Sequence, residues 1–195
     1  MPVRASAGGD ERAFAGAASP VLKLLVVSVT FLFIGTVQGV LQTFPAIAAW
    51  LRGAGAAGHM IDPLAHAHIN LVGGVTMGMM GLFYFVLPRL VARPLYSARL
   101  ADVSFWLSFC GVSLFSGSLI VLGIVEGRMV HAGMSYPQAL AAVGPIHHLL
   151  IVAGGVLMGF GYWSFIANVY LSVFARRRKH ATAVSASPLL KVNTP

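Results

Sequence analysis

Four long stretches of this sequence contain no aspartate, glutamate, lysine or arginine: 24–51, 63–88, 103–125 and 129–175. A helix that crosses a bilayer needs about 20 apolar residues, and its backbone must satisfy its own hydrogen bonds. Only 9% of the residues are charged, whereas a typical soluble domain has about 25%. The sequence therefore predicts an all-α integral membrane protein rather than a soluble enzyme. Its four transmembrane helices are expected near 21–49, 64–88, 103–125 and 145–174.

Lysine and arginine are divided unevenly among the segments that flank these helices. Most of them lie in the N-terminal arm, the 89–102 loop and the C-terminal tail, whereas 52–62 and 126–144 contain only Arg52 and Arg128. Because cytoplasmic loops are enriched in Lys and Arg, we expect both termini in the cytoplasm and the protein in the inner membrane. We divide the chain into a flexible arm (1–20), a four-helix membrane domain (21–175) and a basic cytoplasmic tail (176–195).

The formal net charge of +8 is explained by this topology. The basic run at 176–179 is typical of a membrane anchor that also meets anionic lipid headgroups. We therefore expect lipid as a partner and no nucleic acid.

Pairs of glycines with GxxxG spacing occur in each of the four predicted helices or at their ends: Gly35/Gly39, Gly74/Gly78, Gly123/Gly127 and Gly155/Gly159. Small residues four apart let helix backbones approach closely. The same stripes could instead leave room for a flat cofactor against a helix wall. The spacing alone is compatible with both roles.

Four of the seven histidines lie where two predicted helices begin on the outer side, as the pairs His66/His68 and His147/His148. From the helical rise, His68 lies about 30 Å from Pro88, near the inner end of its helix. His148 lies about 39 Å from the inner end of the last helix, and tilt shortens that height. We therefore expect the two pairs near one level.

Imidazoles from two helices at one depth form a plausible ligand set, because ionisable groups in a bilayer are costly and usually functional. One histidine from each pair, opposed across a gap, would ligate haem b. A three-histidine copper or zinc site is the alternative, and interfacial histidines bonded to headgroups, loops or water are another. We expect no carboxylate within the membrane, and Asp102 at a helix start is expected to cap it.

Residues 66–106 resemble the catalytic subunit (subunit I) of heme–copper oxidases, most closely the C-type, cbb-type branch. The resemblance rests on a histidine and small residues in one helix, an Arg-Pro-x-Tyr-Ser loop and a Phe-Trp pair that opens the next helix. These residues are His68, Gly78, Gly81, Tyr84, Pro88, Arg93, Pro94, Tyr96, Ser97, Arg99, Leu100, Phe105 and Trp106.

This resemblance implies a membrane subunit of a respiratory electron-transfer complex, shaped like one four-helix arc of the family's twelve-helix fold. The segment 103–125 contains no histidine, so the copper–haem centre cannot be assembled from this chain alone. The chain is therefore not expected to be a complete terminal oxidase. A homotrimer or other membrane subunits would complete the ring, and a quinol or membrane partner and a periplasmic cytochrome c would exchange electrons with it.

Together these arguments predict haem b near the outer face, with copper as the weaker alternative. His68 and His148 are the favoured axial ligands. Arg52 and Arg128 would meet the haem propionates, and Gly74/Gly78 and Gly155/Gly159 would form the walls. Two other hypotheses remain open. One is a structural or assembly subunit without haem, and the other is an oxygen- or NO-reducing core that is completed by oligomerisation.

Overall fold

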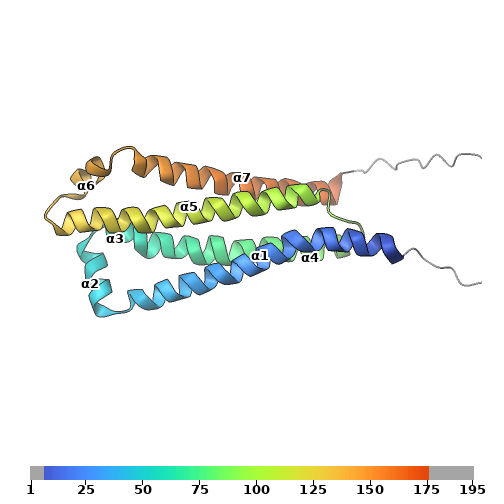
Figure 1. The fold of residues 1–195 in the computed structure, drawn as a ribbon, viewed down its shortest axis with the longest axis horizontal. Helices are drawn as coiled ribbons and strands as arrows, with labels where there is room; N and C mark the ends of the chain where they lie inside the picture. The colour runs from blue at the N-terminus through green and yellow to red at the C-terminus, as the bar shows by residue number, and fades with distance from the viewer. Residues whose placement is uncertain (1–6, 176–195) are drawn as a thin grey trace, which may run out of the picture.

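The computed structural model describes residues 7–175, with side chains from residue 20 onward. Long helical segments run side by side along its length (Figure 1). They are α1 (Ala7–Gln42), the run formed by α3 (Ala56–His59), η1 (Met60–Ala65), η2 (His68–Thr76) and α4 (Met77–Leu90), then α5 (Ala98–His131) and α7 (Ile146–Phe174). Each contains a stretch long and apolar enough to cross a membrane. The predicted four-helix membrane fold is confirmed, and the chain is a multi-pass membrane protein.

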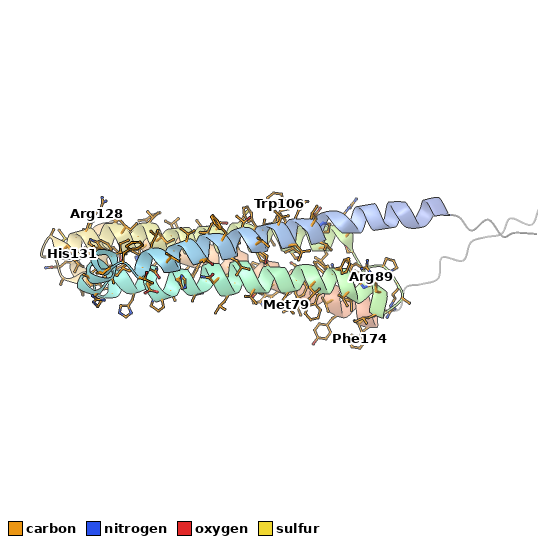
Figure 2. All side chains as sticks on the ribbon, turned by 90° about the horizontal axis from the view of Figure 1, so that it is seen from below. Met79, Arg89, Trp106, Arg128, His131 and Phe174 are labelled. Atoms are coloured by element: carbon orange, nitrogen blue, oxygen red, sulfur yellow. The ribbon has the colours of Figure 1, made fainter. Side chains whose placement is uncertain are left out.

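Two further short helices, α2 (Pro45–Gly53) and α6 (Tyr136–Val143), lie with α3 at one end of the bundle (Figure 1). We call this end the α6 end. The opposite end, the termini end, contains the end of α7 and the start of α1. Figure 2 shows Arg128 and His131 at the α6 end and Arg89 and Phe174 at the termini end. The basic loop predicts that the termini end faces the cytoplasm.

Several helix boundaries differ from the sequence prediction. The first predicted helix, 21–49, is divided in the structure, because α1 ends at Gln42 and α2 begins at Pro45. Helix α5 continues past residue 125 to His131, because the acid that ends its charge-free stretch is paired inside the protein. Helix α1 starts at Ala7, within the predicted flexible arm, where the sequence is rich in alanine, the strongest helix former. The rest of that arm, residues 1–6, and the predicted basic tail, 176–195, lie outside the described residues.

The start of α5 corrects the predicted role of Asp102. Ser97 is the N-cap, and its side chain accepts a hydrogen bond from the backbone N–H of Leu100. Asp102 lies one turn further on, where its carboxylate is 2.9 Å from the Lys23 ammonium of α1. The residue predicted to cap this helix therefore forms an ion pair between two helices.

The α5–α7 contact is built on glycines. A Cβ atom at Gly111 would overlap the backbone of Met158, and one at Gly154 would lie 2.7 Å from the backbone nitrogen of Phe115. These two helices therefore approach until their backbones touch, as small residues permit. At the termini end, Asn168 of α7 accepts from the backbone N–H of Ser97 at 3.2 Å and donates to its carbonyl at 3.0 Å. This clamp fixes the start of α5 against the end of α7.

Candidate functional site

His68 opens η2 and lies half-buried on an otherwise apolar, exposed stripe of this helical run. The stripe contains Leu64, Leu71, Val75 and Met79, with 42%, 59%, 50% and 45% of their surface exposed. The His68 ring lies against Phe115 of α5, with 4.7 Å between ring centres. The position combines a polar ring with an outward-facing apolar surface.

One hydrogen bond determines what the neutral His68 ring can offer. Its Nδ1 lies 2.8 Å from the carbonyl oxygen of Leu64. Because a carbonyl can only accept, Nδ1 carries the proton and Nε2 keeps its lone pair. The π-helical turns that follow, up to Thr76, are of a kind found frequently at functional sites. The neutral His68 ring thus has its Nε2 available as a metal ligand.

The glycines predicted to form cofactor walls divide into two groups. A Cβ at Gly74 would lie 2.5 Å from the Leu32 side chain, and one at Gly78 would lie 2.6 Å from the Ser28 hydroxyl. Both positions are therefore filled by α1. On α7, a Cβ at Gly155 would only touch the Phe115 ring at 4.0 Å, and Gly159 has no neighbour within 4 Å of this position. The open glycine positions are thus those of α7, and Gly155 is the one next to Phe115.

His66 faces a different neighbour from His68. A Cβ at Gly39 of α1 would lie 2.7 Å from the His66 ring. Asn70 donates a hydrogen bond to the His66 carbonyl at 3.0 Å. The two histidines therefore lie on different sides of their helix, as their spacing predicts, and His66 is turned toward α1.

His147, at the start of α7, forms a buried pair with Glu126 of α5. The His147 Nδ1 is 2.6 Å from the Glu126 Oε1, and the Glu126 side chain has no exposed surface. The second carboxylate oxygen, Oε2, has no hydrogen-bond partner among the side chains and backbone that the structure describes. The adjacent His148 is exposed, with its ring centre 5.1 Å from that of His147.

Glu126 is the functional-site candidate that sequence reasoning missed. The only signal for it in the sequence is a single acid at the edge of a charge-free stretch, a position typical of the end of a membrane helix. Its surroundings include Tyr136 of α6: burial raises the pKa of the Tyr136 phenol above its ordinary value, and the Glu126 carboxylate raises it further. Residues of three helices therefore meet around this carboxylate.

The two histidine pairs lie at different levels along the bundle. Phe115 touches both the His68 ring and the backbone of Gly154, so His68 is level with Gly154. His147 and His148 precede Gly154 by about two turns, which places them about 10 Å closer to the α6 end. Leu119, Leu122, Met60 and Ile151 pack together between them. The difference in height that we attributed to tilt is therefore a real offset, and the expectation of one common level is wrong.

The other predicted groups lie apart from His68. Arg52 in α2 and Arg128 in the last turn of α5 are exposed at the α6 end, where His131 Nε2 is 3.0 Å from the Trp50 carbonyl oxygen (Figure 2). Within the described part of the chain, no three histidine, cysteine, aspartate or glutamate side chains come close enough to hold one metal ion. The alternative three-histidine site is not assembled there.

Comparisons with known proteins agree with the resemblance. A family model described as cytochrome C and quinol oxidase polypeptide I matches residues 11–156. Cytochrome c oxidase subunit 1 of Rhodobacter capsulatus is 29% identical over 164 residues, which cover 76% of this chain and 30% of the relative.

Two further relatives give the same picture. The cbb3-type cytochrome c oxidase subunit CcoN1 of Stutzerimonas stutzeri is 29% identical over 159 residues, 74% of this chain and 32% of the relative. A cytochrome c oxidase subunit 1 homolog of Agrobacterium tumefaciens (strain T37) is 24% identical over 181 residues, 88% of this chain and 32% of the relative. The chain thus spans about a third of the length of these relatives.

Proposed function

Because the chain belongs to the cytochrome c and quinol oxidase polypeptide I family, we propose that it is a membrane subunit of a respiratory electron-transfer complex that binds haem b. The proposed ligand is His68. The proposed location of the protein is the inner membrane, with both termini in the cytoplasm and the α6 end on the outer side. When bound, the haem supplies a one-electron carrier within the membrane.

The observation that carries this proposal is the surface around His68. The ring has its Nδ1 bonded to the Leu64 carbonyl and its Nε2 free, and it rests on Phe115, whose ring lies 4.0 Å from the Cβ position of Gly155. A flat, apolar cofactor needs such a surface, with one nitrogen donor and no bulky side chain next to it. The donor set therefore fits an iron porphyrin.

The remaining residues have supporting roles in this proposal. Phe115 orients the His68 ring and shields one side of it from lipid. Arg52 and Arg128, exposed at the α6 end, are the proposed partners of the haem propionates, through charge-assisted hydrogen bonds. Electrons would pass between a quinol or membrane partner and a periplasmic cytochrome c or similar protein.

A reduced-minus-oxidised optical spectrum with a pyridine haemochrome assay tests haem binding directly. We expect a b-type spectrum from the detergent-purified protein, lost in His68→Ala. The matched control is His131→Ala, because that histidine is bonded to the Trp50 carbonyl at the α6 end and should leave the spectrum intact.

Two outcomes would contradict the proposal. A colourless wild-type protein would leave a structural or assembly subunit as the better function. A full spectrum in His68→Ala together with its loss in His148→Ala would instead support His148, the second of the two axial ligands favoured from the sequence.

A further inference from the structure

We propose that two copies of this chain bind one haem b between them, with His68 of each copy as the two axial ligands. This inference rests on the proposed function, since it requires that the protein binds haem. It identifies where the second ligand comes from, which the single chain leaves open.

Among residues 20–175, whose side chains the structure describes, no second histidine lies opposite His68. His147 and His148 lie about two turns further toward the α6 end, about 10 Å away along the axis. The space between is filled by Leu119, Leu122 and Ile151. His147 also has its Nδ1 held by Glu126 at 2.6 Å, and His66 is turned toward Gly39 of α1.

Membrane geometry determines which residue of a second copy can lie opposite His68. Copies with the same topology are related by a rotation axis along the membrane normal, so each residue keeps the depth of its counterpart. In a two-fold dimer the same surface patch meets itself. The residue that is level with His68 in such a pair is His68 of the second copy.

The surface around His68 suits such a pair. The exposed residues Leu64, Leu71 and Val75 surround a half-buried imidazole, and an ionisable group at an apolar membrane surface is costly without a partner. Figure 2 shows Met79 of the same stripe projecting from the bundle. The two faces of a porphyrin core are equivalent, so one iron can accept the same ligand from both sides.

Each copy also has an unbonded ring nitrogen on His68 and two open glycine positions on α7. Each copy would contribute one Nε2 lone pair, because Nδ1 donates to Leu64. Each would also contribute Gly155 and Gly159, where a Cβ atom would meet nothing closer than the Phe115 ring at 4.0 Å. The exposed Trp163, one turn beyond Gly159, would lie at the edge of the shared surface.

The first test measures the ratio of haem to protein and the mass of the particle. The wild-type protein, purified in mild detergent, is assayed for haem by pyridine haemochrome, for protein by amino-acid analysis and for mass by native mass spectrometry. We expect one haem for every two chains in a homodimer, with a low-spin six-coordinate spectrum.

The second test uses a hybrid dimer. Two differently tagged copies, one wild type and one His68→Ala, are coexpressed and purified through both tags in sequence. We expect the hybrid to lose the low-spin spectrum, giving a high-spin five-coordinate haem or reduced haem occupancy. A hybrid with His148→Ala serves as the matched control and should remain low-spin.

The contrary outcomes separate this inference from the proposed function. One haem per chain in a monomer or trimer, a ligand supplied by a different co-purified polypeptide, or an unchanged low-spin His68→Ala hybrid would each overturn the shared site while leaving haem binding intact. A wild-type protein without haem would overturn both.

Discussion

Replacing Glu126 by alanine tests the buried pair that joins α5 to the start of α7. The substitution leaves the His147 Nδ1, now 2.6 Å from Glu126 Oε1, without its acceptor in a site where the carboxylate has no exposed surface. Leaving a buried donor without its acceptor typically costs about 1–3 kcal/mol of unfolding free energy, and more where a charged group is involved. Glu126→Gln keeps an acceptor oxygen, so a smaller loss of stability is expected for that variant.

Unfolding is measured in mixed detergent micelles. Circular dichroism monitors the loss of helix as the fraction of denaturing detergent rises. The control is Asp102→Asn, which removes the charge of another interhelical carboxylate contact, near the opposite end. The Lys23 and Asp102 side chains are 35% and 48% exposed, so solvent screens that pair and its loss should cost less than about 1 kcal/mol. A Glu126→Ala variant no less stable than Asp102→Asn would refute the argument that burial makes the first pair stronger.

Three further substitutions test other contacts. Gly111→Ala should lower the stability by about 1–3 kcal/mol, because the new methyl group would overlap the Met158 backbone; Gly117→Ala, at a position with open space, should have no such effect in the same detergent titration. Asn168→Ala should increase hydrogen exchange at residues 96–98, because the clamp on Ser97 is lost; unchanged protection would contradict this role. For Tyr136, the raised pKa means that its contribution to stability is fully present below the unfolded-state tyrosine pKa of about 10 and is lost as the pH rises through the folded-state value. A pH series of thermal unfolding should show a smaller alkaline loss in Tyr136→Phe, and identical slopes would count against it.

The four membrane helices could be predicted because long uncharged stretches have few alternatives in a bilayer. The extension of α5 to His131 could not, since it depends on a partner for Glu126 that lies 21 residues later in the chain. From the sequence alone, such an acid is taken to mark the end of the membrane helix. Only the packing of α7 on α5 shows that one oxygen of this carboxylate is paired inside the protein.

The candidate site was partly predictable for a similar reason. The sequence identified His68 from its position at a helix start and from the surrounding motif. The relative height of His68 and His147 depends on how far α7 is displaced along α5, and that displacement is set by glycine contacts such as Gly154 on Phe115. Distances along one helix are fixed by its rise, whereas the offset between two helices is not.

The pairing of Glu126 with His147 also has a consequence for how the chain enters the membrane. Helix α5 is synthesised before its partner, and His147 follows Glu126 by 21 residues. At about 5–20 residues per second, the carboxylate waits for roughly 1–4 seconds without its imidazole. Because Glu126 lies near the α6 end of α5, we expect it to spend this interval at the headgroup–water boundary, and α5 to reach its final depth only after α7 arrives.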